Sequence, residues 1–189
     1  MELPLFPLNA HLLPGGIMPM RIFEPRYQRL VSLASARGFV LCMLDPQAQQ
    51  AVRNMLPIGT RVEIVDFDLL GDGLLGITVR GVERVRLGEV RQEADGLRWG
   101  EVAALPPWPS VSVSVSPAFI PLVEKLREVF DDYPEYGALY REPHWEDGCW
   151  VAQRWLEMLP LSPHQKQWLL GEESCAPALA LLERLVQSG

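Results

Sequence analysis

Lysine, histidine and cysteine are scarce in this sequence, and their scarcity excludes several kinds of site. A P-loop ends in Gly-Lys-Ser/Thr, but neither of the two lysines, Lys125 and Lys166, follows a glycine. A zinc site needs clustered thiolates and imidazoles, but the three histidines lie far apart and no CxxC or HExxH spacing occurs. No GxSxG turn is present to activate a serine nucleophile. We therefore expect no catalytic residue, no metal and no cofactor.

Long apolar runs are also absent. The first twenty residues are largely apolar, but Pro4, Pro7, Pro14 and Pro19 divide them into pieces shorter than the roughly 20 residues of a membrane helix. The first basic residue, Arg21, follows this stretch, whereas a signal peptide carries its basic residues ahead of the apolar segment. We therefore expect these residues to belong to the folded chain, with no membrane segment. Three cysteines, far apart and odd in number, favour a reducing, cytoplasmic location.

The overall composition is that of an ordinary globular protein. Of the 189 residues, 48% are hydrophobic and 22% are charged, so the chain can form one large domain or two small ones without disulfides or metals. The net charge of -7 would repel a phosphate backbone. Nucleic acid is therefore not an expected partner.

The character of the sequence changes at LPPWPSVSVSVSP, residues 105–117. Short apolar runs bounded by Gly, Pro and Asp come before it, and apolar positions with helical spacing come after it. We predict a β-rich part over residues 1–107, a linker over 108–117 and a helical part over 118–189. The VSVSVS alternation is also compatible with a half-buried strand.

Several short strands are predicted in the first part. LPLFPL and GIMPMRIF are two of them, and Pro4 and Pro7 must interrupt pairing on opposite edges of the first, through a bulge, a short edge strand or a crossing between sheets. FVLCML, residues 39–44, is apolar throughout, as in a strand covered on both faces. Residues 60–104 indicate an antiparallel meander that turns at GDG (residues 71–73) and at Asp95-Gly96, with Gly81 at a bulge or break.

One helix is predicted between the second and third strands. Glu24 and Pro25 suit its first turn, and Arg37 and Gly38 suit its end. Its apolar face would consist of four residues, Tyr27, Leu30, Val31 and Ala34. Strands with one early helix predict a barrel-like sheet and an α+β fold rather than a doubly wound nucleotide-binding fold.

Four helices are predicted in the second part, over residues 117–133, 145–159, 163–170 and 177–186. The third has the clearest ends: Ser162 is placed as N-cap, Pro163 as first helical residue, Gln165 as the partner in a capping box and Gly171 as terminator. Short connections between these helices favour a compact antiparallel bundle.

The order of several motifs along the chain resembles a known family. These motifs are LPLFPL, LLPGG, MPMRIFEPRY, GTRVEIVDF, GITVRGVERVRL and LPLSPHQKQWLL. They resemble the N-terminal substrate-recognition domain of ATP-dependent Lon proteases, and most of all the bacterial stand-alone proteins made of that domain alone. The resemblance runs from Leu3 to the last helix, and LPLFPL followed by IFEPRY is its most specific part. It implies a PUA-like pseudobarrel followed by a helical bundle.

What the resemblance implies about function is binding rather than catalysis. A P-loop ATPase module and a Ser-Lys protease module are both missing from the 189 residues. The resemblance therefore implies a non-catalytic peptide- or protein-binding module, with an unfolded or tagged polypeptide or a partner protein as ligand and a place in protein quality control.

The candidate binding residues are those that match the IFEPRY-type motif, namely Arg21, Phe23, Glu24, Arg26 and Tyr27. They also have a purely structural interpretation. Phe23 and Tyr27 can join the helix to the sheet, Glu24 can serve the helix N-terminus, and Arg26 can form a surface ion pair. A cleft between barrel and bundle is a second candidate site, because ligands often bind between domains.

Two other functions are compatible with such a fold. A pocket of the barrel could hold a small molecule, and a concave site with convergent polar groups would favour that function, whereas a shallow apolar groove would favour a peptide. RNA binding would need a basic face that bears aromatic residues, which the acidic composition disfavours.

Overall fold

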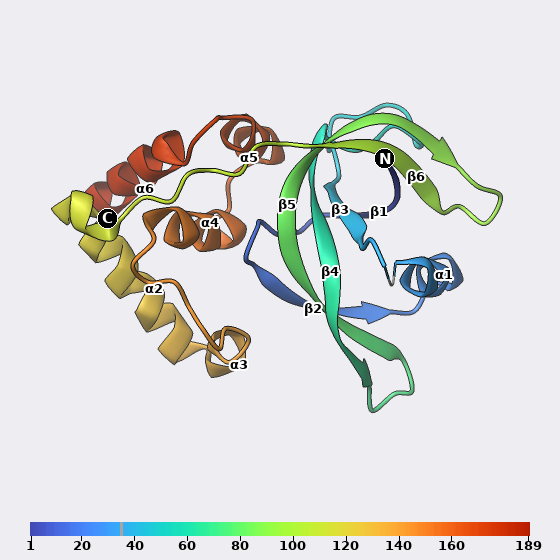
Figure 1. Cartoon of the computed structure of the whole chain (residues 1–189), viewed down its shortest axis with the longest axis horizontal. Coiled ribbons are helices and arrows are strands. Elements are labelled where there is room, and N and C mark those ends of the chain that lie inside the picture. The colour runs from blue at the N-terminus through green and yellow to red at the C-terminus, as the bar shows by residue number, and fades with distance from the viewer. Residues whose placement is uncertain (35) are drawn as a thin grey trace.

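The computed structural model describes residues 1–34 and 36–189. Its β-rich half and its helical half lie side by side along the long axis of the molecule (Figure 1). The strands are β1 (Glu2–Leu8), β2 (Ile17–Ile22), β3 (Phe39–Met43), β4 (Ile58–Leu69), β5 (Leu75–Gln92) and β6 (Arg98–Ala104). They form one sheet in the order β2-β5-β4-β3-β1-β6, and β6 also pairs with β5. This additional pairing nearly closes the sheet into a ring, in agreement with the predicted barrel-like α+β fold.

The first strand changes partner at its midpoint, which explains its two prolines. Residues Glu2–Leu5 pair antiparallel with β6, and Leu5–Leu8 pair parallel with β3. The carbonyl of Leu8 accepts from Leu44 beyond the end of β3, so even-numbered residues of β1 point their backbone groups toward β3. Pro4 would point its missing N–H toward β3, but the pairing with β3 begins only at Leu5. Pro7 would point its missing N–H toward β6, but the pairing with β6 has already ended at Leu5. Neither proline therefore interrupts a pairing that is present.

The long strands β4, β5 and β6 form the expected antiparallel meander. Its register shifts beside Gly81, where Val62 pairs with Gly81 but the preceding Arg61 pairs with Glu83. A Cβ atom at Gly81 would overlap the carbonyl oxygen of Leu13, and Gly81 exchanges backbone hydrogen bonds with the loop before β2. Gly81 is therefore required because two backbone segments meet there.

The early helix is shorter than its sequence predicts. Helix α1 spans Pro25–Leu33, with Ala34 as its C-cap. Gly38 has the positive φ of 72° that suits a terminator, but it lies beyond the helix, and Arg37 is not in the last turn. The predicted apolar face is correct, because Tyr27, Leu30 and Val31 are buried and Ala34 packs with them.

The helical half contains five α-helices in the described chain. They are α2 (Ile120–Asp132), α3 (Pro134–Gly137), α4 (Gly148–Met158), α5 (Pro163–Leu170) and α6 (Ala176–Ser188). The capping box of α5 forms as predicted, because Ser162 accepts from the Gln165 N–H and the Gln165 side chain accepts from the Ser162 N–H. Helix α3 has no counterpart in the prediction, and α4 begins at Gly148 with Asp147 as N-cap rather than at residue 145. None of these helices is long and apolar enough to cross a membrane.

The segment between the halves is packed rather than free. It contains a 3₁₀ turn, Val113–Val115, in place of the alternative strand. Trp108 is buried, and its Nε1–H donates to the carbonyl oxygen of Glu172 over 2.8 Å. The carbonyl of Val111 accepts from the Gly148 N–H over 2.6 Å. The division into domains at residues 107 and 117 stays a prediction.

Buried side chains join the two halves. The apolar cluster of the helical half includes four residues of the β-rich half, Leu13, Met43, Leu56 and Ile58. The Gln167 amide pairs with the backbone of Ile58, donating over 2.7 Å and accepting over 2.9 Å, as a neighbouring strand would. The fully buried Arg154 guanidinium donates to the Pro14 carbonyl over 2.8 Å. These bonds fix the loop before β2 and the start of β4 on the helices.

Candidate functional site

The predicted motif residues surround a surface hollow of about 450 Å³ where β1, β2 and α1 meet. We call it the motif hollow. Its apolar lining consists of Phe6, Pro7, Leu8, Met18, Pro19, Met20, Phe23, Tyr27 and Leu44. All five predicted site residues line it.

The hollow lies where the ring of strands remains open. The pairing of β6 with β1 stops at Leu5, and in the described chain β2 pairs with β5 alone. Met18 and Met20 stand opposite the buried Val79 and Ile77, so they point to the core face of the sheet. Helix α1 covers part of that face, and the methionines are only partly buried at the uncovered edge.

Tyr27 and Phe23 have different environments although both belong to the motif. Tyr27 is 9% exposed and its ring stacks on Phe6, with 4.1 Å between the centroids. Burial raises the pKa of the Tyr27 phenol. Phe23 is 64% exposed, so it packs between the helix and the sheet much less than Tyr27 does. Tyr27 therefore accounts for the packing in this part of the motif, and Phe23 presents an aromatic ring to solvent.

The charged residues of the motif form ion pairs at the rim of the hollow. Arg26 donates from Nε to a Glu24 carboxylate oxygen over 2.8 Å, and its guanidinium lies 4.7 Å from the centroid of the Tyr27 ring. Glu24 is the N-cap residue of α1, but its side chain accepts no capping hydrogen bond. Arg21 forms an exposed ion pair with Asp72 in the turn between β4 and β5.

Arg98 also lines the hollow, and sequence reasoning missed it. It lies on β6 opposite Leu5, so pairing between distant segments brings it to the motif. Its guanidinium donates to the Asn54 side-chain oxygen over 2.6 Å and to the Ala51 carbonyl over 3.0 Å. Its buried Nε–H has no hydrogen-bond partner among the described residues. No local sequence signal marks Arg98.

The predicted cleft between the two halves is also present, with a volume of about 810 Å³. Its walls come from β2, β4 and β5 on one side and from residues 138–150 on the other. Tyr140 and Trp150 line it together with Arg80, Arg141 and His144. The lining mixes aromatic and charged groups, and the Tyr140 hydroxyl is already engaged by the Ile17 N–H over 3.0 Å.

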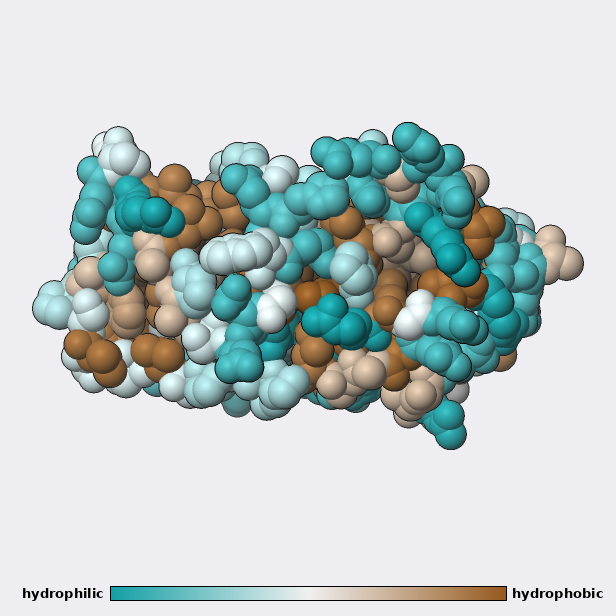
Figure 2. Space-filling view, turned by 90° about the horizontal axis from the view of Figure 1, so that it is seen from above, coloured by the Kyte–Doolittle hydropathy of each residue, from teal (hydrophilic) through white to brown (hydrophobic). Residues whose placement is uncertain are grey.

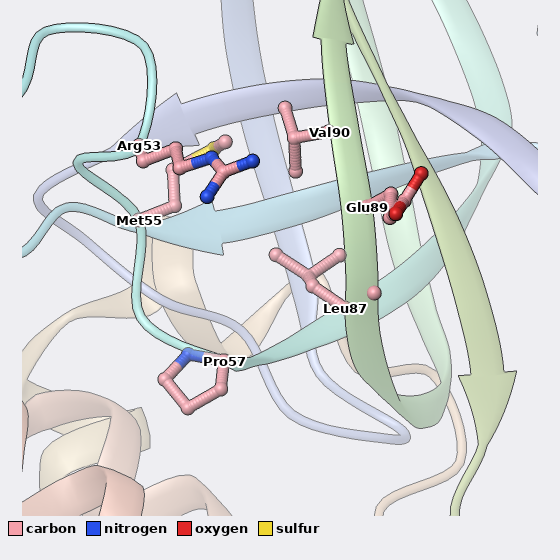
Figure 3. A pocket seen from close by; sticks show the side chains of 7 residues that line it. Arg53, Met55, Pro57, Leu87, Glu89 and Val90 are labelled. Atoms are coloured by element: carbon pink, nitrogen blue, oxygen red, sulfur yellow. The ribbon is translucent and has the colours of Figure 1, made fainter.

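A third hollow, of about 400 Å³, lies beside the irregular part of β5. In Figure 3 the Leu87 and Val90 side chains extend to one side of β5 and that of Glu89 to the other. Met55, Leu87 and Val90 pack on the buried cluster that includes Leu3 and Leu5. Apolar patches on the upper face of the molecule are interrupted by polar side chains (Figure 2). The third hollow is therefore the outer surface of a core cluster, lined by apolar residues of β5 and of the segment before β4.

Comparison with known proteins identifies the family of this fold. Residues 2–188 match the family model described as the ATP-dependent protease La (LON) substrate-binding domain. The chain belongs to this Lon substrate-binding domain family. The structure superposes on a Lon N-terminal domain protein from Xanthomonas campestris with a TM-score of 0.73 and 31% identity, covering 96% of both chains. The N-terminal domain of Lon protease from the Mycobacterium avium complex shares the fold, with a TM-score of 0.62, 15% identity and 96% coverage of both chains.

One curated protein matches a shorter stretch. Lon protease 2 of Myxococcus xanthus is 28% identical over 145 residues, which cover 74% of this chain but 18% of that protein. The chain thus spans less than a fifth of this relative. Because the substrate-binding domain accounts for residues 2–188, the 189 residues contain no ATPase or protease domain of the Lon type.

Proposed function

We propose that this protein is a non-catalytic module that binds extended, unfolded polypeptide through the motif hollow. The observation that carries the proposal is an aromatic ring, Phe23, exposed beside a hollow with an apolar floor. Unfolded chains differ from native proteins in the apolar side chains that they expose. A hollow lined by methionines suits varied sequences, because the flexible thioether adapts to different side chains.

The shape and chemistry of the hollow favour a peptide over a small polar ligand. About 25 cal/mol are gained for each Å² of apolar surface removed from water, so apolar side chains of a peptide can supply most of the binding energy. Both Met18 and Met20 are available at the edge of a sheet. The family description, a substrate-binding domain, agrees with a polypeptide ligand.

Side chains rather than strand addition should hold the peptide. The Ile17 N–H points away from β5, since it donates to Tyr140, so by alternation Pro19 and Arg21 also face the free edge of β2. Pro19 has no N–H to donate, and Ile17 has already used its own. Only Arg21 would then offer a free N–H, too few for a continuous ladder.

Binding of a fluorescent, acetylated and amidated apolar peptide, followed by anisotropy, tests the proposal. We expect Phe23→Ala to weaken binding about tenfold, since a buried aromatic contact contributes roughly 1–2 kcal/mol at an interface. Trp168→Ala is the matched control, because Trp168 on α5 is 63% exposed and lies outside the hollow. Equal affinity of both variants and the parent protein would reject the motif hollow as the binding site.

The same peptide should compete with a chemically unfolded protein and not with its native form. A folded competitor that displaces the peptide equally well would argue for a specific partner protein instead. Polypeptide recognition in protein quality control remains part of the proposal.

A further inference from the structure

We infer that the motif hollow selects polypeptide segments in which acidic side chains flank apolar ones. This inference rests on the proposed function and specifies its ligand. Three arginines and one glutamate line the hollow, Arg21, Arg26, Arg98 and Glu24, in a chain whose net charge is -7. The motif hollow therefore carries a local excess of positive charge beside its apolar floor, although the protein as a whole is acidic.

Arg98 is the strongest source of this excess. Its two known acceptors, the Asn54 amide oxygen and the Ala51 carbonyl, are both neutral. No carboxylate pairs with Arg98 in the part of the chain that the structure describes. Because hydrogen bonds to neutral oxygens leave the guanidinium charge uncompensated, a carboxylate beside it would gain a charge-assisted interaction.

The other two arginines differ in how far their charge is offset. Arg26 is held by Glu24 at 2.8 Å, with both side chains partly exposed. Arg21 is held by Asp72, which comes from the β4–β5 turn outside the hollow. Both pairs are accessible, so a ligand carboxylate can share these guanidinium groups, each of which has several donors.

The β4–β5 hairpin extends the apolar side of this surface. Phe67 stands opposite Ile77 and Leu69 opposite Leu75, so both project from the face that carries Met20. Phe67 is 60% exposed and Leu69 is 77% exposed. This hairpin reaches beyond the body of the sheet (Figure 1), so a segment of several residues can contact apolar groups on one side and arginines on the other.

The test compares four acetylated, amidated peptides with the same apolar residues. Three carry flanks of Glu, Gln or Lys, and the fourth has no flanking polar side chain. In roughly 50 mM salt we expect the Glu peptide to bind about tenfold more tightly than the Lys peptide, with the Gln peptide between them. Raising the salt to roughly 500 mM should reduce the difference to about twofold, because exposed charges are screened.

Two variants change the preference in opposite directions. Arg98→Gln should bring the Glu and Gln peptides within about twofold of each other, and Arg98→Lys should restore most of the difference. Glu24→Gln removes the one carboxylate of the lining, so it should increase the preference for the Glu peptide. Arg184→Gln on α6 makes the same change in net charge as Arg98→Gln away from the hollow and should leave the preference unaltered. Glu24→Gln keeps the test informative if Arg98→Gln does not fold, since its side chain makes no capping bond.

The outcomes distinguish a failure of the inference from a failure of the proposed function. If all four peptides bind with equal affinity, the hollow binds polypeptide without discriminating between charged flanks. This result overturns the inference, while the proposed function stands. If no peptide binds, both fail. If single-stranded RNA binds more tightly than the Glu peptide and competes with it, the arginines bind phosphate groups rather than peptide carboxylates. This result overturns the inference. A free C-terminal carboxylate that replaces the Glu flank with equal affinity would likewise overturn the assignment to side chains.

Discussion

Tyr27→Ala should destabilise the fold much more than Phe23→Ala, although the two residues are four positions apart in one motif. Tyr27 buries nearly all of its side chain against Phe6 and the core of α1. An aromatic side chain carries about 200 Å², so at about 25 cal/mol per Å² its burial contributes roughly 5 kcal/mol as an upper estimate. Aromatic-to-alanine changes in cores cost about 3–5 kcal/mol, which agrees with this value.

The same calculation gives Phe23 a small role in stability. With 64% of Phe23 exposed, about a third of its surface is buried, which gives about 1.8 kcal/mol as an upper estimate and an expected loss of about 1–1.5 kcal/mol. In urea unfolding followed by tryptophan fluorescence, Tyr27→Ala should lower the free energy of unfolding by about 4 kcal/mol and the Tm by roughly 10 °C. Tyr27→Phe keeps the stacked ring and should cost less than about 1 kcal/mol, since the hydroxyl makes no hydrogen bond within the described residues.

A specific result would refute this reasoning. If Tyr27→Ala and Phe23→Ala lower the free energy of unfolding by the same amount, the motif acts as one packing unit and the exposed ring of Phe23 has no separate role. If Tyr27→Phe costs as much as Tyr27→Ala, the stack on Phe6 is not the source of the stability.

Two further predictions concern the junctions in the fold. Gly81→Ala should lower the free energy of unfolding by more than about 2 kcal/mol, measured by urea unfolding, because its Cβ would overlap a backbone carbonyl that cannot move alone; Gly71→Ala, in an open turn, is the control and should cost less than about 1 kcal/mol. His11 is buried beside the Lys166 ammonium, and desolvation, with the nearby Lys166 charge, lowers its pKa from 6.5 to about 3. The unfolded chain then binds a proton between these pH values that the folded chain does not, so stability falls as the pH drops below 6.5, by up to about 1.4 kcal/mol per pH unit. His11→Gln should remove this part of the slope between pH 6 and about pH 4, measured as the difference from the parent protein; parallel profiles of the two proteins would contradict the assignment.

The sequence correctly predicted the structural features that are determined by residues close together in the chain. The capping box at Ser162 and Gln165 fixes the start of α5 through bonds within one turn. The unbroken apolar run of β3 corresponds to five buried residues, because Phe39 and Leu41 pack in one apolar cluster and Val40 and Cys42 pack in another on the opposite face. The predicted interruption at Pro4 and Pro7 is present as a change of partner, since each proline can occupy only an unpaired edge.

Other features depend on distant segments and could not be read locally. Helix α1 ends at Leu33 although Arg37 and Gly38 offer suitable chemistry for its end, which shows that the local signals did not decide its length. Arg98 reaches the motif hollow only because β6 pairs with the first strand. The alternation of Met18 and Met20 in MPMRIF did hold information about the hollow, since it places both on one face of an edge strand.

The methyl groups of the methionines provide the most direct measurement of the central claim. Of the six methionines, Met18 and Met20 line the motif hollow, Met55 lines the hollow beside β5, and Met158 lies on α4. In a titration with an unfolded apolar peptide, ¹³C-methyl NMR should show saturable shifts for Met18 and Met20 and none for Met55 and Met158. Saturable shifts at Met55 or Met158, with Met18 and Met20 unchanged, would place the binding site elsewhere and contradict the account.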